Sequence, residues 1–310
     1  MQTLVSHKNR HQFGGSSVLL IILAGLLVLG VVAYFVLQEY ATSKAKEEVD
    51  AVVTTMRSQG AVDLTYSDVS YDLLGQNVVI SDVDLKAPTG GGYTVEEVVV
   101  RDYDTENDIP EYFAMEVNNF LMEVNESNFN EQWEDIRALG YETIQGDMVI
   151  DYRIDNEAQT FVINELSLDA VDFCEMKFSV SLGSITVNEA TLMAYLFDPS
   201  SITVTSASLS YTDDSLVVRA MEQAAREEDL TLDEVKNQAL QGIDEAIEEA
   251  RQAGSERGVL LMEAVKTFIL DPGTLSITMN PPQPVSVGQL TETPTPFEAL
   301  DLMHMEVEVN

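Results

Sequence analysis

The chain has 310 residues, 45% of them hydrophobic, and its 53 Asp and Glu against 16 Lys and Arg give a formal net charge of −37. The hydrophobic content excludes general disorder, and the negative charge repels nucleic-acid phosphates, so nucleic acid is not an expected partner. Because Cys174 is the only cysteine, an intrachain disulfide is excluded, and we expect a small buried hydrophobe rather than a reactive thiol.

The segment from Val18 to Leu37 has 20 residues without a charge, Pro, Asn or Gln. As a helix rising about 1.5 Å per residue, it spans roughly the 30 Å core of a bilayer. A cleaved signal peptide is the main alternative, but its apolar core usually has only about 7–15 residues. We therefore predict a signal anchor that forms a single transmembrane helix over residues 18–38. Tyr34 and Phe35 near its end suit an aromatic interface belt or are apolar filling of the helix.

The orientation of this helix rests on the distribution of charge along the chain. Basic residues flank it almost equally, with Lys8 and Arg10 before it and Lys44, Lys46 and Arg57 after it. All 53 acidic residues follow the span, and the tail before it is short. The sequence therefore predicts a bacterial inner-membrane protein with a cytoplasmic tail (1–17), a stalk helix (39–60) and a periplasmic domain (61–310).

Alternating apolar and polar residues predict strands from Ala61 onward. Residues 61–74 and 78–87 are separated by a Gly-Gln-Asn turn, and we expect them to form an antiparallel hairpin. A third strand is expected at 93–103. The next segment, 110–124, fits either a helix or a strand.

A short helix and a second group of strands follow. The sequence of residues 131–139 predicts a helix that ends at Gly140. Three alternating runs of about ten residues each, at 146–155, 159–170 and 172–182, meet at turn residues. Their simplest arrangement is an antiparallel meander.

The acidic stretch from Asp102 to Asp108 places oxygen-bearing side chains at alternate positions of a possible calcium loop. It departs from a calcium-binding loop at two defining positions, because Asn107 replaces the turn glycine and Phe113 replaces the bidentate Glu. A solvated acidic loop is therefore the favoured interpretation, and no metal is expected there.

Two segments resemble each other at a spacing of 73 residues, LFDPSSITV from Leu196 and ILDPGTLSI from Ile269. Each joins a helix-like run, 188–196 or 256–270, to a β-rich run through Asp-Pro. A proline just past a helix end stops the helix, so each Asp-Pro is a predicted helix-to-strand corner. The pair indicates either a duplicated helix–turn–strand unit or a common turn that is used twice.

The region 216–270 between these corners predicts three consecutive helices, inserted between β runs. Thr231 and Glu234 form a capping box that starts the second helix. Apolar residues then recur at three- and four-residue spacing, which forms a stripe expected to face the rest of the domain. The sequence leaves three roles open for this stripe: it covers a sheet face, it is a lid over an apolar ligand, or it binds a partner protein. Its candidate ligand or partner residues are Leu232, Val235, Ala239, Ile243 and Ile247.

Residue types that common catalytic sites need are scarce after the predicted span. Of the three histidines, only His304 lies there, which excludes a multi-His zinc site or a His-dependent triad in that part. The sequence has no phosphate-cradling glycine loop, nucleophile elbow or dinucleotide fingerprint, so no cofactor is expected. Carboxylate pairs remain available among the 53 acids, which leaves an Asp/Glu-dependent hydrolase of envelope glycans as the alternative to a non-catalytic role.

The N-terminal anchor, the hairpin strand 78–85 and the late segment 271–287 resemble the bacterial envelope proteins of the YdgA or AsmA-like kind. The resemblance covers the architecture of most of the chain and no specific motif. It implies a location in the cell envelope and, for the AsmA-like proteins, a part in lipid traffic.

Together these patterns predict an α+β protein, with one N-terminal transmembrane helix followed by a mainly antiparallel β domain with a helical insertion. We expect it to be non-catalytic and to bind an envelope partner or an apolar, lipid-like ligand. A long apolar groove would favour this function, whereas a polar cleft with two facing carboxylates would favour the hydrolase.

Overall fold

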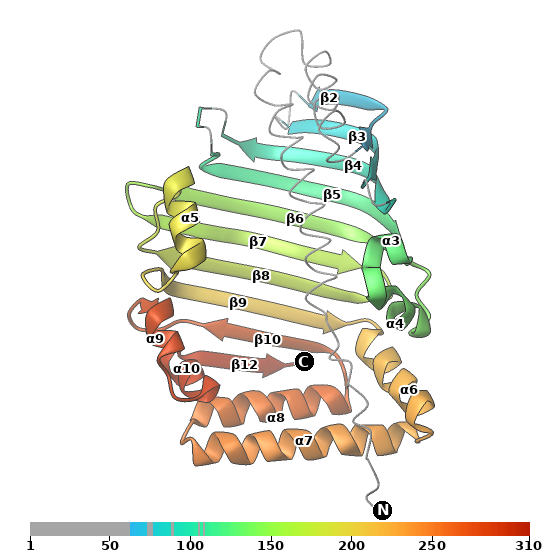
Figure 1. Ribbon diagram of the computed structural model, residues 1–310, viewed down its shortest axis with the longest axis vertical. Coiled ribbons are helices and arrows are strands. Elements are labelled where there is room, and N and C mark those ends of the chain that lie inside the picture. Colours follow the sequence, from blue (N-terminus) through green and yellow to red (C-terminus); the bar gives the residue numbers. More distant parts are fainter. Residues whose placement is uncertain (1–62, 73–76, 88–89, 105, 108) are drawn as a thin grey trace, which may run out of the picture.

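One antiparallel sheet dominates the computed structural model, which describes residues 63–72, 77–87, 90–104, 106–107 and 109–310 (Figure 1). Its main path runs in the order β1-β3-β4-β5-β6-β7-β8-β9-β10-β12, while β2 pairs with β3 and β11 with β9. Most neighbours along this path are consecutive in the chain, so the sheet is largely a meander. The strands are β1 (Asp63–Thr65), β2 (Asp68–Asp72), β3 (Asn77–Lys86), β4 (Gly92–Tyr103), β5 (Tyr112–Glu123), β6 (Thr143–Asp155), β7 (Thr160–Ala170), β8 (Cys174–Gly183), β9 (Thr203–Asp213), β10 (Thr274–Met279), β11 (Val285–Ser286) and β12 (Met305–Val309).

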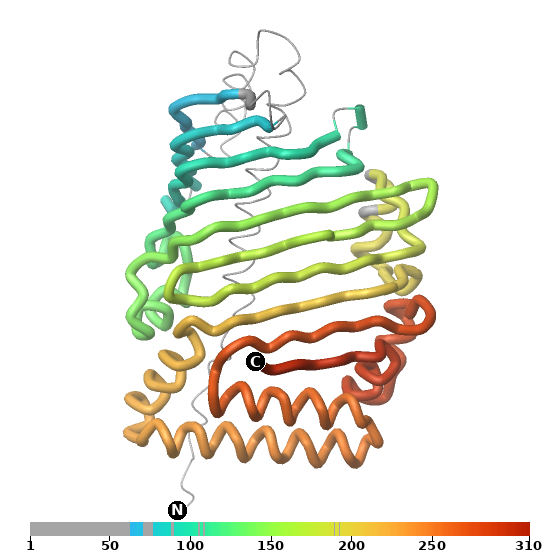
Figure 2. The backbone as a smooth tube through the Cα atoms, turned by 180° about the vertical axis from the view of Figure 1, so that it is seen from behind, coloured from blue at the N-terminus to red at the C-terminus, as the bar shows by residue number. Residues whose placement is uncertain are grey.

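The helices lie at the two ends of the strands and beyond one edge of the sheet (Figures 1 and 2). Helices α5, α9 and α10 lie near one end of the strands, and α3, α4 and α6 lie near the other. Helices α7 and α8 run side by side beyond β12. The helices are α3 (Glu126–Phe129), η1 (Asn130–Gln132), α4 (Trp133–Ala138), α5 (Glu189–Phe197), α6 (Leu216–Glu228), α7 (Leu232–Gln252), α8 (Glu256–Leu270), α9 (Val287–Thr291) and α10 (Pro296–Leu302).

The mainly antiparallel α+β architecture that the sequence predicts is confirmed for the described residues. Strands β2 and β3 form the predicted hairpin, and β6, β7 and β8 form the predicted meander. The ambiguous segment 110–124 contains strand β5, which pairs with β4 on one side and β6 on the other. These two neighbours satisfy its backbone N–H and C=O groups, which local sequence alone does not reveal.

The predicted cytoplasmic tail (1–17), transmembrane helix (18–38) and stalk helix (39–60) lie outside the described residues. Among the helices that the structure describes, none is long and apolar enough to cross a bilayer. The relation of the chain to a membrane therefore stays a prediction.

Local signals mark the helix ends where the sequence predicts them. In the capping box of α7, the Glu234 N–H donates to Thr231 Oγ1 at 3.3 Å, and the Thr231 N–H donates to the Glu234 carboxylate at 2.7 Å. The two Asp-Pro corners share one backbone geometry, with φ/ψ of −145°/90° at Asp198 and −140°/86° at Asp271. Both corners lead from a helix into a strand, as predicted, and both interpretations of their likeness stay open.

Bulges keep the apolar side chains of the long strands on one face. Between Val117 and Phe120 the register of β5 against β6 shifts, and Asn119 at this position has a φ of 53°. Asp147 accepts a hydrogen bond from the Asn119 N–H at 2.7 Å, which fixes the irregular backbone. Because of this bulge, Val117 and Phe120 are both buried although they are three residues apart.

Helix α7 lies in a different place from the sheet-covering position that the sequence suggested. It packs against α8 and α6, and both views show it outside the outline of the strands (Figures 1 and 2). The ion pair between Lys266 of α8 and Asp244 of α7, at 2.5 Å, joins the two helices. The apolar stripe of α7 therefore packs in a helical hairpin rather than over the sheet, since periodicity predicts a buried face but not the partner that buries it.

Candidate functional site

The register of the strands aligns apolar side chains into rows that cross the sheet, because directly paired residues of neighbouring strands share a face. Two rows extend from β3 to β12, and Tyr211 contributes the one polar group in them. We call the face that carries these rows the apolar face. The first row is Val78, Val100, Met115, Ile150, Leu166, Phe178, Leu209, Ile277 and Val307, and the second is Ile80, Val98, Val117, Met148, Leu168, Met176, Tyr211, Leu275 and Val309.

A third, shorter row supports the same face from β4 onward. It contains Tyr103, Phe113, Tyr152, Ile163, Val180, Ala207, Met279 and Met305. Two of its aromatic members contact each other across the strands, since Phe113 and Tyr152 have ring centroids 6.1 Å apart. The apolar character of the face therefore extends along the strands as well as across them.

The opposite face of the sheet is polar over strands β7 to β12. Hydroxyl side chains pair across the strands there, with Ser179 and Ser208 at 2.7 Å and Thr212 and Thr274 at 2.9 Å. Lys177 on the same face forms an ion pair with Glu175 at 2.7 Å. The two faces of this half of the sheet therefore have opposite chemistry.

Coverage of the apolar face changes from one end of the sheet to the other. At β3 to β5 it is sealed, since Val100 is 0% and Met115 1% exposed. Phe129 and Ile136, from the segment that contains α3 and α4, belong to the same buried cluster. At β7 to β10 the rows are mostly half-buried, and Leu209 is 36% exposed. The second half of the face is therefore the part that a ligand can reach.

Helix α8 and the C-terminal segment cover only the far margin of this second half. Phe268 of α8 lies against Tyr211, with ring centroids 5.8 Å apart, and both Phe268 and Met305 are buried. Leu166, Phe178 and Leu209, which are nearer the middle of the first row, stay half-buried or exposed. The accessible part of the apolar face therefore lies between two covered regions.

Few ionisable groups border the apolar face, and burial raises the pKa of two of them, Tyr211 and Cys174. The Tyr211 hydroxyl donates to Asp213 at 2.9 Å, and burial raises the pKa of Tyr211. Burial also raises the pKa of Cys174 to about 12, with a smaller effect from Asp213 and neighbouring carboxylates. Cys174 is thus a buried thiol held in its neutral form, as the sequence analysis predicts.

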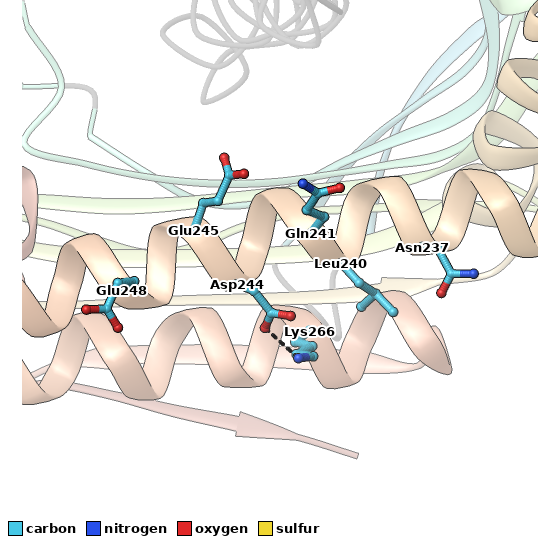
Figure 3. Close-up of a pocket in the computed structure, with 7 residues that line it drawn as sticks. All are labelled: Asn237, Leu240, Gln241, Asp244, Glu245, Glu248 and Lys266. Atoms are coloured by element: carbon cyan, nitrogen blue, oxygen red, sulfur yellow. Dashed lines mark hydrogen bonds and ion pairs between the residues drawn. The ribbon is translucent and has the colours of Figure 1, made fainter.

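The five predicted residues of α7 lie on the partly covered side of the helix, and their role as a ligand or partner face stays a prediction. Leu232, Val235, Ala239 and Ile243 are half-buried and Ile247 is buried. A separate hollow of about 500 Å³ lies beside them, lined by Asn237, Leu240, Gln241, Asp244, Glu245, Glu248 and Lys266 (Figure 3). Four of these seven side chains are charged and two carry amides, so Leu240 is the one apolar residue in the lining.

The acidic loop that begins at Asp102 is organised around Asp104. Its carboxylate accepts hydrogen bonds from the backbone N–H groups of Glu106 and Glu111 at 2.8 and 2.9 Å, and from Asn107 Nδ2 at 2.7 Å. Burial opposes ionisation of Asp104, but these donors outweigh it and lower its pKa. This carboxylate therefore holds its own loop together.

Metal-ligating residues form no cluster in the part of the chain that the structure describes. No group of three or more His, Cys, Asp and Glu in that part could hold a metal ion. His304 is exposed and has a φ of 50° in the turn before β12.

Two comparisons with known proteins give a match. A family model described as an uncharacterized protein matches residues 167–310. An uncharacterized protein of Aquifex aeolicus strain VF5 is 27% identical over 165 residues, which are 53% of this chain and 51% of the relative. The chain therefore spans about half the length of the curated relative that it matches. The family match begins within β7 and includes α5 to α10.

The sequence pattern predicts individual strands, but it does not predict that their apolar side chains form one face that could bind a ligand. Each strand shows its alternation locally, as in Phe178-Ser-Val-Ser-Leu182. The rows exist only because the register aligns the apolar positions of successive strands, and a shift of one residue would move a whole strand's apolar set to the other face. The available signal was the repetition of the same alternation in strand after strand.

Proposed function

We propose that this protein is a single-pass bacterial inner-membrane protein whose periplasmic domain binds the acyl part of a lipid-like ligand on the apolar face. The observation that carries this proposal is the pair of unbroken apolar rows, half-exposed over β7 to β10 and backed by a polar face. A protein of this kind acts by binding rather than by covalent chemistry.

The size of the half-exposed region suits an acyl chain. Strands lie about 4.8 Å apart, so the half-exposed rows from β7 to β10 extend roughly 14 Å. The length of one acyl chain is about half of the roughly 30 Å thickness of the hydrocarbon core of a bilayer. Burial of each CH2 group contributes about 0.8 kcal/mol. One chain laid along a row would therefore gain this free energy on the side that contacts the apolar face.

The hydrolase alternative receives no support from the acidic groove beside α7. Glu245 and Asp244 project from the same helix in different directions, and Asp244 is paired with Lys266 (Figure 3). A glycosidase needs two carboxyl groups that face each other across the substrate, about 5–9.5 Å apart. The groove does not offer that arrangement.

Photo-crosslinking in living cells tests the proposed ligand directly. A photoreactive phenylalanine analogue replaces Leu209 on the apolar face or, as the matched control, Ser208 on the opposite face of the same strand. We expect adducts of lipid mass at position 209 and none at position 208. Equal labelling at both positions, or no lipid adduct at 209, would contradict the proposal, and a protein adduct at 209 alone would indicate an envelope partner instead.

A substitution pair checks that the rows themselves bind the ligand. Phe178→Ser removes a large side chain from the first row, whereas Lys177→Ser changes the neighbouring residue on the polar face. We expect Phe178→Ser to lower the lipid adduct at position 209 several-fold and Lys177→Ser to leave it unchanged. An equal effect of the two substitutions would mean that the adduct reports stability rather than binding.

The topology needs its own test. A reporter fused after Asn310 should be active only if it is of the kind that works outside the cytoplasm. Activity of a cytoplasm-only reporter at this position would overturn the predicted orientation.

A further inference from the structure

We infer that helix α5 inserts its exposed apolar end into a neutral bilayer and docks the apolar face to the membrane, an inference that rests on the proposed function. Met193, Leu196 and Phe197 of α5 are 56%, 77% and 85% exposed. At three- and four-residue spacing they share one side of the helix. Single exposed leucines are common on protein surfaces, but three large apolar side chains gathered in this way form an interaction patch.

Hydrogen bonds fix the start of helix α5, so the exposed side chains lie on an ordered helix. Asn188 caps the helix by accepting hydrogen bonds from the N–H groups of the first turn at 3.0 and 3.1 Å. The Thr186 N–H donates to the Tyr195 hydroxyl at 3.2 Å, and the Val187 N–H donates to Asn156 Oδ1 at 2.8 Å. Because Asn156 lies in the turn after β6, these bonds fix α5 at that end of the half-exposed strands.

The second Asp-Pro corner shows how much of the exposure of α5 accompanies the corner itself. Helix α8 ends at Asp271 with the same backbone geometry as α5 at Asp198. In α8, however, Phe268 is buried against Tyr211. Phe197 and its counterpart Leu270 are both exposed, at 85% and 51%, whereas Leu196 is 77% exposed and its counterpart Ile269 is half-buried.

The chain that precedes β1 identifies a bilayer as the occupant of this patch. The 20-residue uncharged run 18–37 predicts a membrane span, and residues 38–62 join it to β1. A connection of this length reaches about 37 Å as a helix and at most about 85 Å when extended. The domain is thereby kept within reach of one membrane surface, where α5 meets lipid at high effective concentration.

The charge around α5 favours neutral lipid. Segment 184–202 contains Glu189 and Asp198 and has no Lys, Arg or His. Amphipathic helices that bind anionic membranes carry basic residues on their polar face, and this one has none. Insertion at this end would bring the turn between β6 and β7 to the bilayer surface, so that a lipid could pass between the membrane and the apolar face.

Tryptophan quenching in vesicles tests the insertion. The full chain, with its only tryptophan changed by Trp133→Phe, is reconstituted into phosphatidylcholine vesicles whose acyl chains carry bromine. Phe197→Trp probes α5, and Val171→Trp is the matched control, because Val171 is 62% exposed in the turn at the opposite end of β7. We expect bromine to quench and blue-shift the emission at 197 and to leave that at 171 unchanged. Should Trp133→Phe impair folding, the same comparison is made by difference with Trp133 retained.

The outcomes separate this inference from the proposed function. Equal quenching at 197 and 171, or none at 197, overturns insertion by α5, whether or not lipid adducts form at position 209. Quenching at 197 without a lipid adduct at 209 supports membrane docking and contradicts the proposed function. Stronger quenching in phosphatidylglycerol than in phosphatidylcholine overturns the preference for neutral lipid.

A substitution links docking to ligand loading. Phe197→Asp places a charge at the exposed end of α5, and Val171→Asp does the same at the opposite end of β7. We expect Phe197→Asp to lower the lipid adduct at position 209 several-fold and Val171→Asp to leave it unchanged. Unchanged adducts in both variants would show that loading does not pass through α5.

Discussion

The two halves of the sheet carry the same apolar rows but differ in what covers them. Met115 and Leu209 belong to one row, yet Met115 is buried in the β3–β5 half and Leu209 is exposed in the β7–β10 half. The segment around α3 and α4 adds buried side chains to the first half. The difference teaches that an amphipathic strand pattern makes either a core or a binding surface, and that the covering element decides between them.

The largest expected effect comes from truncating the same row in both halves. Met115→Ala should lower the free energy of unfolding by about 2–5 kcal/mol, because it leaves a cavity in a sealed core. Leu209→Ala should cost less than about 1.5 kcal/mol, since its side chain already contacts solvent. Chemical denaturation of the full chain in detergent, followed by circular dichroism, measures both values. Equal losses would show that the second half is as tightly covered as the first.

A pair of glycine substitutions compares the sheet with the helical hairpin beside it. A Cβ at Gly146 of β6 would overlap the backbone oxygen of Asp169 in β7. Gly146→Ala should therefore cost about 1–3 kcal/mol through overpacking. A Cβ at Gly242 of α7 has no atom within 4 Å among the described residues, so Gly242→Ala should stabilise the protein by about 0.5–1 kcal/mol. Thermal unfolding of both variants gives the signs, and a loss of stability in Gly242→Ala would mean that α7 has a partner close to this position.

The attachment of α7 can be weakened without touching the sheet. Thr231→Ala removes the capping box at the start of α7 and should cost about 1 kcal/mol. Because α7 packs mainly on α8 and α6, we expect faster hydrogen exchange over residues 232–252 and unchanged exchange in β6 to β8. Faster exchange in all of these elements together would show that the hairpin and the sheet unfold as one unit.

The smallest expected effect concerns Asp214, which follows β9 in the second half. Partial removal from water and the nearby carboxylates of Asp169 and Asp213 raise its pKa above the ordinary value of 3.8. An acid with a raised folded-state pKa destabilises the fold once it is ionised, so its cost appears as pH rises through this range and persists at neutral pH. Because solvent screens this exposed side chain, Asp214→Asn should raise the free energy of unfolding at pH 7 by only a few tenths of a kcal/mol.

The control for Asp214 is the pH dependence itself. The gain from Asp214→Asn should disappear below pH 3.8, where the aspartate is protonated in both the folded and the unfolded state. A gain that persists at acid pH would point to a packing effect of the amide rather than to charge.

The sequence by itself determined the features that depend on neighbouring residues. Alternation specified strands β2 to β4 and β6 to β8, the capping box marked the start of α7, and Asp-Pro ended α5 and α8. These signals are local, since a strand's period, a cap and a proline each act within a few residues. The predicted span at 18–38 has the same local basis and awaits the topology test.

Only the tertiary structure decided which elements meet. Segment 110–124 became strand β5 because β4 and β6 pair with it, and α7 packed on α8 because that hairpin, not the sheet, lies against its stripe. The apolar rows depend on the register of nine strands, and the exposure of Leu196 against the half-burial of its counterpart Ile269 depends on what surrounds two corners of equal local geometry. Pairing and coverage join residues that are far apart in the chain, and their free energy comes from surface buried between elements, which no local pattern records.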